Sequence, residues 1–269
     1  MSPIIALYET LRLLTPYDIN IGKIRMGNKM GDGGYVIADC LRLGQPVFSF
    51  GIGSECSFDL QLAERGHPVF QYDHTIDGPP FVHPGFHFHR LGLASESDPA
   101  VGLLTLHDHV AAVRPRLGGA TLLKIDVEGA EWSVLAAADD MTLGQFDQIV
   151  VEVHGLLQLW KPEVCDCAHR ALSNLTKQFT LFHVHANNYA PVGVVGPFVV
   201  CDVMELSYIR SDLVRRAPSR TLYPTALDTG NNAQAQDIPL WFFPFAPEVP
   251  VAEGERRALL HRLERVVSW

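Results

Sequence analysis

Short apolar runs alternate with amphipathic stretches through the middle of the chain. Apolar runs bounded by turn-forming residues indicate buried strands, and apolar positions three or four apart indicate helices. The predicted strands cover residues 47–50, 69–72, 86–91, 121–125, 148–153, 179–184 and 198–206. The predicted helices between them cover residues 58–65, 100–113, 130–138 and 162–178. This alternation predicts an α/β fold, with a mostly parallel sheet, right-handed crossovers and helices on both faces.

The two ends of the chain differ from this alternating middle. Residues 3–14 place Ile4, Leu7, Leu11 and Leu14 on one stripe, which predicts an N-terminal packing helix ended by Pro16. Residues 210–269 are rich in proline and loops, with a last helix predicted over 253–267. No repeat or linker divides the chain, so we expect one domain over residues 1–269.

Composition narrows the class of protein. The chain has 269 residues, of which 47% are hydrophobic and 19% charged, which excludes global disorder. A net charge of −9 argues against a nucleic-acid partner. The five cysteines lack the paired spacing of a metal site, which favours reduced thiols. The sequence shows no recognisable leader and no apolar run long enough to span a membrane. We therefore expect a cytoplasmic protein without a membrane partner, and association with a second copy is left open.

A glycine turn follows the first of the predicted parallel strands. Gly51 and Gly53 come directly after residues 47–50, at the start of a predicted helix. Such a turn brings backbone N–H groups close to a nucleotide-like ligand. Asp73 ends the next strand, about twenty residues on, where an acid suits hydrogen bonds to ribose hydroxyls. Cys56 stands where a dinucleotide fingerprint would have its third glycine, so this pattern is incomplete.

Acidic residues gather after the fourth strand. Asp126, Glu128 and Glu131 fall within six residues of one another, at a strand end and a helix start. The helix dipole accounts for acids at positions 128 and 131. Asp126 at the strand tip has no such explanation, which makes it a candidate functional residue.

Several motifs together resemble one known family. They are Gly31-Asp32-Gly33-Gly34-Tyr35-Val36, Ser49-Phe50-Gly51-Ile52-Gly53, Ser57-Phe58-Asp59, Ala63-Glu64-Arg65-Gly66 and, most specifically, Lys124-Ile125-Asp126-Val127-Glu128-Gly129-Ala130-Glu131. Between about residues 22 and 206 the chain resembles the FkbM-type S-adenosylmethionine-dependent methyltransferases, close to the branch that includes methyltransferase-like protein 24. It departs from the family pattern at Cys56, where Trp is often found.

The resemblance implies a class I, Rossmann-like methyltransferase fold, with a seven-stranded sheet whose final strand is antiparallel. It implies that S-adenosylmethionine lies over the first, second and fourth parallel strands. Gly51 and Gly53 would approach the methionine part, Asp73 would hold the ribose, and residues 91–95 would border the adenine. The cofactor-binding residues implied in this way are Asp32, Gly33, Tyr35, Gly51, Gly53, Asp73, Ser95 and Asp126.

Methyl transfer to a hydroxyl needs alignment, and a positioned base helps. His154 ends the strand expected beside Asp126, so we predict His154 as the base and Asp126 as its catalytic partner. A divalent metal held by Asp126, Glu152 and His154 is the less favoured alternative, since Mg²⁺ prefers oxygen ligands. The residues predicted to bind the acceptor are Glu128, His185, Asn187 and Asn188.

The function that follows is O-methylation of a hydroxyl on a sugar or a glycosylated small molecule. Polar side chains with several donors and acceptors suit such a polyhydroxylated acceptor. Two alternatives stay open at this point. One is a nicotinamide-dependent oxidoreductase with the same glycine turn, and the other is a catalytically idle module that retains the cofactor fold.

Overall fold

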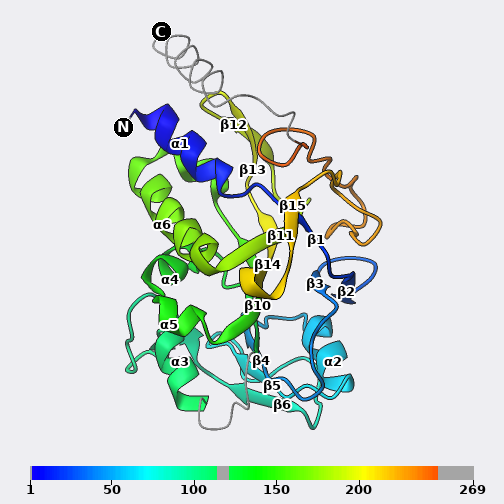
Figure 1. The fold of residues 1–269 in the computed structure, drawn as a ribbon. Coiled ribbons are helices and arrows are strands. Elements are labelled where there is room, and N and C mark those ends of the chain that lie inside the picture. Colours follow the sequence, from blue (N-terminus) through cyan, green and yellow to red (C-terminus); the bar gives the residue numbers. More distant parts are fainter. Residues whose placement is uncertain (1, 114–120, 248–269) are drawn as a thin grey trace.

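The structure is a computed structural model that describes residues 2–113 and 121–247. Its centre is a seven-stranded sheet in the order β11-β14-β10-β9-β4-β5-β6 (Figure 1). Strand β14 runs antiparallel to both neighbours, and the other neighbouring pairs are parallel. The bounds are β4 (Val47–Phe50), β5 (Val69–Tyr72), β6 (Phe86–His89), β9 (Thr121–Ile125), β10 (Phe146–Val153), β11 (Phe179–Ala186) and β14 (Met204–Arg210). The predicted mostly parallel, seven-stranded α/β fold is confirmed.

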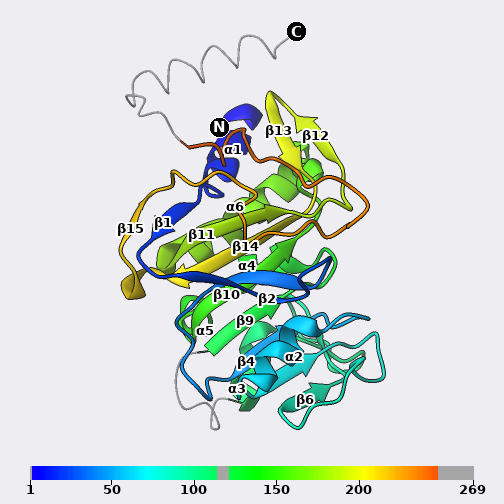
Figure 2. The ribbon, with the colours of Figure 1, turned by 90° about the vertical axis from the view of Figure 1, so that its right-hand side faces the viewer.

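Most of the helices cover one face of this sheet (Figures 1 and 2). They are α1 (Pro3–Arg12), α3 (Leu106–Val113), α4 (Glu131–Ala137), α5 (Asp140–Leu143) and α6 (Pro162–Gln178). The opposite face is covered by α2 (Ser57–Glu64) and by an antiparallel hairpin of β2 (Lys23–Gly27) and β3 (Gly34–Ala38). Both faces of the sheet are therefore buried, which explains why its central strands are continuous apolar runs.

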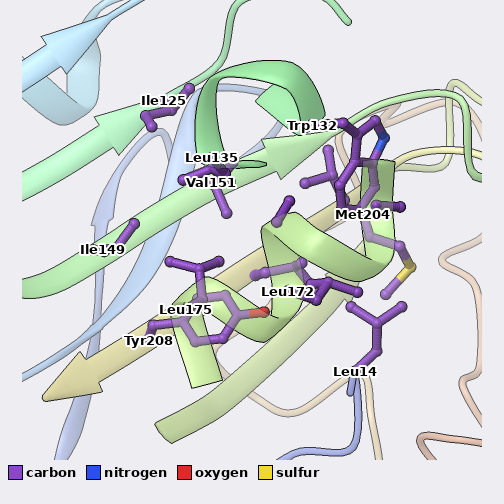
Figure 3. Close-up of a cluster of buried hydrophobic side chains, with 14 of the residues drawn as sticks. Leu14, Ile125, Trp132, Leu135, Ile149, Val151, Leu172, Leu175, Met204 and Tyr208 are labelled. Atoms are coloured by element: carbon purple, nitrogen blue, oxygen red, sulfur yellow. The ribbon is translucent and has the colours of Figure 1, made fainter. Parts of the chain in front are cut away.

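Helix α6 forms the centre of the larger core. It begins with Pro162 at its first position, where the missing N–H costs nothing. Figure 3 shows Leu172 and Leu175 of α6 close to Ile149 and Val151 of β10. Burial of one such side chain stabilises the fold by about 1.5–3 kcal/mol, so this core holds the helices firmly against the sheet.

Short accessory pairs surround the sheet. Strand β1 (Tyr17–Ile19) pairs with β15 (Arg216–Pro218), and β7 (Gly92–Leu93) pairs with β8 (Leu103–Leu104). Strands β12 (Val192–Val195) and β13 (Phe198–Cys201) form a hairpin beside the 3₁₀ helix η2 (Leu156–Trp160). A second 3₁₀ helix, η3 (Ser211–Leu213), links β14 to β15.

Several element boundaries differ from the prediction. The strand expected over 198–206 is two strands, because the backbone turns at Asp202, whose carbonyl and carboxylate accept the N–H groups of Leu156 and Leu157. The helix expected over 100–113 begins only at Leu106, since a turn around Gly102 leads into β8 first. The N-terminal helix ends at Arg12, short of residue 14. The helix predicted over 253–267 lies outside the described residues.

After β15 the chain runs without helices or strands from residue 219 to residue 247, a stretch we call the C-terminal strap. The strap crosses the sheet near β11, where Tyr223 packs edge-on against His183. Among residues 2–113 and 121–247, none of the helices combines the length and the apolar character that a bilayer span requires.

Candidate active site

A cavity of about 510 Å³ opens at the carboxyl ends of β4, β5 and β9. This is where ligands bind in open parallel sheets, and its size suits a small molecule. The cavity is bordered by the glycine turn that the sequence predicted, by the loop before β3 and by the segment after β7. Its lining includes Asp32, Gly33, Tyr35, Gly51, Gly53, Glu55, Asp73, Leu93, Ala94, Asp126 and Glu128.

The two glycines of the turn have different tasks. Gly51 has a φ of +76°, and a Cβ there would lie 1.5 Å from the carbonyl oxygen of Asp126, so the close approach of β4 and β9 requires glycine. Gly53 has a φ of +54°, and a Cβ there would meet no atom within 4 Å. The space that Gly53 leaves open belongs to the cavity.

Asp73 holds the glycine turn in place. One carboxylate oxygen accepts the N–H groups of Ile52 and Gly53, each at 2.9 Å. The other accepts the N–H and hydroxyl of Thr75 at 2.8 and 2.6 Å. Burial disfavours the carboxylate, but these hydrogen bonds outweigh it and lower the pKa of Asp73. These four donors occupy the lone pairs of the Asp73 carboxylate. To bind Asp73, a ribose hydroxyl would therefore have to replace one of the Thr75 hydrogen bonds.

The loop before β3 meets the cavity from the opposite side. The Tyr35 hydroxyl donates to Asp126 at 2.9 Å, and Asp32 accepts from Asn231 of the C-terminal strap at 2.9 Å. The structure thus places Asp32, Gly33 and Tyr35 at the cavity, and their role in cofactor binding stays a prediction. Ser95 is not part of the lining, which reaches Ala94.

Lys124 is a buried residue that also lines the cavity. Its Nζ donates to the carbonyl of Gly51 at 2.5 Å and lies 3.4 Å from Asp126. Burial disfavours the ammonium, but the charges of Asp126, Asp59 and Glu152 outweigh it and raise the pKa of Lys124. The buried charge therefore links the glycine turn to the acid at the tip of β9.

A second polar region adjoins Asp126 at the end of β10. His154 Nδ1 lies 3.2 Å from Glu131, while Nε2 lies 3.4 Å from Glu128 and 3.5 Å from Glu152. The Trp132 indole donates to the carbonyl of His154 at 2.7 Å, which fixes the strand end. Asp126 and His154 are therefore neighbours, as the order of the strands predicted.

The protonation of His154 argues against its predicted role as general base. Burial disfavours the imidazolium, but the hydrogen bond to Glu131 and the charges of Glu131, Glu152 and Asp126 raise the pKa of His154 to about 9. A raised pKa favours the doubly protonated ring, which has no lone pair to accept another proton. As a base, His154 would first have to lose a proton.

Three predicted acceptor-binding residues are occupied by other contacts. His185 is buried between Glu205 and Asp237, both at 3.1 Å. Asn188 holds the strap through backbone groups, including the N–H of Asn232 at 2.6 Å. Asn187 donates to Glu152 at 2.9 Å.

These contacts hold the strap beside the site, and acceptor binding by His185 and Asn188 stays a prediction. They arise between residues distant in sequence, which explains why spacing could not show them. Glu128 does reach the cavity and is 84% exposed.

Sequence reasoning missed two residues of this site. It attributed Glu131 to the helix dipole, yet its fully buried carboxylate accepts the N–H groups of Val127 and Gly129 and orients His154. Lys124 was considered only as part of the family motif. The signal that could have revealed it is a lysine near the end of an otherwise apolar strand.

Comparison with known proteins finds one similarity. Residues 85–177, about a third of the chain, match the family model described as the methyltransferase FkbM domain. This part of the chain is similar to an FkbM-type methyltransferase domain. The match includes Lys124, Asp126, Glu131 and His154, while the glycine turn and Asp73 precede it. No curated protein matches the chain. The branch of the FkbM family stays a prediction.

Proposed function

We propose that the protein is an S-adenosylmethionine-dependent O-methyltransferase that acts on a hydroxyl of a sugar or a glycosylated small molecule. The observation that carries this proposal is the position of Asp126. Its carboxylate borders the cavity beside the glycine turn and also adjoins the polar region around His154. Methyl donor and acceptor must meet at such a boundary.

The cavity fits the proposed cofactor. The open space at Gly53 leaves room for a ligand close to the backbone, which a side chain there would fill. Gly51 and Gly53 would border its methionine part, Asp73 its ribose, and Leu93 and Ala94 its adenine. When bound, the cofactor supplies a methyl group on a positively charged sulfur. The carboxylates of Asp126 and Glu128 face that side of the cavity and favour a cation there.

The acceptor side is rich in hydrogen-bond acceptors. Asp126 and Glu128 border the cavity, and Glu152 lies 3.5 Å from His154 beyond them. Carboxylates accept hydrogen bonds and cannot donate any when ionised, so they select a ligand that carries several donors. A polyhydroxylated acceptor supplies these donors, whereas a flat apolar one would leave the carboxylates unpaired.

Alignment is the main contribution that these residues make in the proposal. Holding an acceptor oxygen in line with the methyl group can lower the barrier by several kcal/mol. Asp126 is itself held by Tyr35 and Lys124, so its carboxylate is a fixed point for orienting the acceptor hydroxyl. The Trp132 indole, which donates to the carbonyl of His154, fixes the end of β10 in the same way.

Mass spectrometry tests the proposal. Purified protein is incubated with S-adenosylmethionine that carries a deuterated methyl group and with a panel of nucleotide sugars, glycosides and simple phenols. We expect a labelled methyl group on a sugar-containing compound, and none with heat-inactivated protein. Labelling of phenols alone would contradict the acceptor class. Binding of S-adenosylhomocysteine without any product across the panel would favour the idle module.

A further inference from the structure

Four ligand-type side chains converge where β9 and β10 end. The ligand atoms of Asp126, Glu128 and His154 all lie within 4.8 Å of one another. Glu152 adjoins them, 3.5 Å from the Nε2 of His154. Carboxylate oxygens and imidazole nitrogen are ligands for Mn²⁺ and related divalent ions. Glu128 is exposed, so its side chain has the freedom to close around an ion.

The imidazole is oriented as a metal ligand would be. The Nδ1 of His154 faces the buried carboxylate of Glu131, which leaves Nε2 directed toward Glu128 and Glu152. Glu131 is fixed in turn by the N–H groups of Val127 and Gly129. Metal-binding histidines characteristically donate their second N–H to a carboxylate, which fixes the tautomer and the ring orientation.

Glu128 and Glu152 share the His154 ring as their ionic partner. Within residues 2–113 and 121–247, neither Glu128 nor Glu152 forms an ion pair with lysine or arginine. Glu152 is only 5% exposed, and among these residues Asn187 is its one hydrogen-bond donor besides the His154 ring. Buried carboxylates are normally paired with a cation or coordinate a metal. Lys124 is directed to Asp126 and the glycine turn.

We propose that Asp126, Glu128 and His154 bind one divalent cation, Mn²⁺ or Mg²⁺, at the boundary between the cavity and the acceptor region. The site differs from the metal set expected from sequence, because Glu128 takes the place of Glu152, which lies beside the ligands. Glu131 is a positioning residue for His154.

The role of this ion rests on the proposed function, although its binding does not. The ion holds and polarises the acceptor hydroxyl next to the cofactor pocket. The acceptor oxygen then forms its bond to the methyl carbon as the carbon–sulfur bond breaks. The hydroxyl proton leaves to solvent, and S-adenosylhomocysteine is the neutral second product.

Electron paramagnetic resonance of Mn²⁺ tests the site on the full chain without cofactor or acceptor. Free hexaaqua Mn²⁺ gives a strong signal that falls when the ion binds protein. We expect the wild-type protein to remove one Mn²⁺ per chain from the signal, with Mg²⁺ competing for the same site.

Variants locate the ion. Glu128→Gln removes an exposed carboxylate whose loss leaves the core intact, and we expect at least tenfold weaker Mn²⁺ binding. Glu131→Gln should weaken binding about 10–100-fold, as expected for a residue that orients a ligand. Glu64→Gln, which removes an exposed carboxylate at the end of α2, is the matched control and should bind as wild type does.

Two results would overturn the proposal. One is a wild-type chain that leaves the Mn²⁺ signal unchanged. The other is equal Mn²⁺ affinity in wild type, Glu128→Gln and Glu64→Gln. If Mn²⁺ fails to bind while an amino sugar is methylated, the cation that these acids accept is the ammonium group of the acceptor. Because Mn²⁺ binding is measured alone, a failure here is separate from a failure to bind S-adenosylhomocysteine.

Discussion

Asp126 connects the parts of the site at the scale of single residues. Its carboxylate accepts a hydrogen bond from the Tyr35 hydroxyl and forms an ion pair with Lys124. Its backbone carbonyl lies so close to Gly51 that a side chain at position 51 would not fit. Asp126, at the tip of β9, therefore contacts both the β3 segment and the glycine turn. The neighbouring His154 lies at the end of β10, so this strand also borders the site.

Asp73→Ala tests the second fixed carboxylate. We expect the affinity for S-adenosylhomocysteine to fall by about 1–3 kcal/mol, or roughly 5–150-fold, because the backbone N–H groups of Ile52 and Gly53 lose their acceptor and the turn loosens. Thermal stability should fall with it. Isothermal titration calorimetry measures the affinity, with Asp77→Ala, an exposed neighbouring acid, as the control. Equal affinity in both variants would rule out this role of Asp73.

His154→Ala separates catalysis from cofactor binding. We expect turnover to fall by about 10–100-fold while S-adenosylhomocysteine affinity stays near the wild-type value, because His154 is a ligand of the proposed ion and lies outside the cofactor cavity. Steady-state kinetics and calorimetry on the same preparation measure the two quantities. A fully active variant would remove His154 from the mechanism and leave Asp126 as the next residue to substitute.

At the scale of elements, the C-terminal strap is fastened to β11 by histidine–carboxylate pairs. His183 contacts Asp228 at 2.7 Å, and His185 contacts Asp237 at 3.1 Å. Burial disfavours the Asp228 carboxylate, but the His183 contact outweighs it and lowers the pKa of Asp228 to about 2. Asn231 of the strap donates to Asp32 at the cavity, so these pairs hold the strap beside the site.

The pH dependence of stability tests this fastening. Burial disfavours the His185 imidazolium, but Glu205 and Asp237 outweigh it and raise the pKa of His185 to about 10. A raised folded-state pKa stabilises the fold below the unfolded value of about 6.5, and that stability is lost as pH rises toward 10. We expect His185→Gln to destabilise the protein by a few kcal/mol at pH 6 and by much less at pH 10, measured by urea unfolding. An equal loss at both pH values would contradict the pairing.

The elements show where sequence patterns sufficed. Strands β4, β5 and β9 and helix α6 have the predicted bounds, because buried parallel strands are continuous apolar runs and Pro162 marks a helix start. The break at Asp202 was missed because its partners, Leu156 and Leu157, lie far away in sequence. The contacts of His185 and Asn188 with the strap were missed for the same reason, since the strap carries no periodic pattern.

At the scale of the whole molecule, two differently covered sheet faces place the site. Helices α4 and α6 lie on one face, and the β2–β3 hairpin lies on the other (Figure 1). The hairpin brings the Tyr35 hydroxyl to Asp126. The glycine turn and the acids after β9 were recognisable because the topology sends both to one sheet edge. The protonation of His154 was not, because it depends on three carboxylates whose positions only the fold reveals.

Binding of S-adenosylhomocysteine to a matched pair of glycine variants tests the central claim most directly. Gly53→Asn fills the open space of the cavity, and asparagine tolerates the φ of +54°. Gly44→Asn makes the same change at a positive-φ glycine in an exposed loop with equally open space. By calorimetry, wild type and Gly44→Asn should bind one S-adenosylhomocysteine per chain, and Gly53→Asn should bind it at least tenfold more weakly. Equal binding by both variants, or binding of NAD in place of S-adenosylhomocysteine by the wild type, would contradict the account.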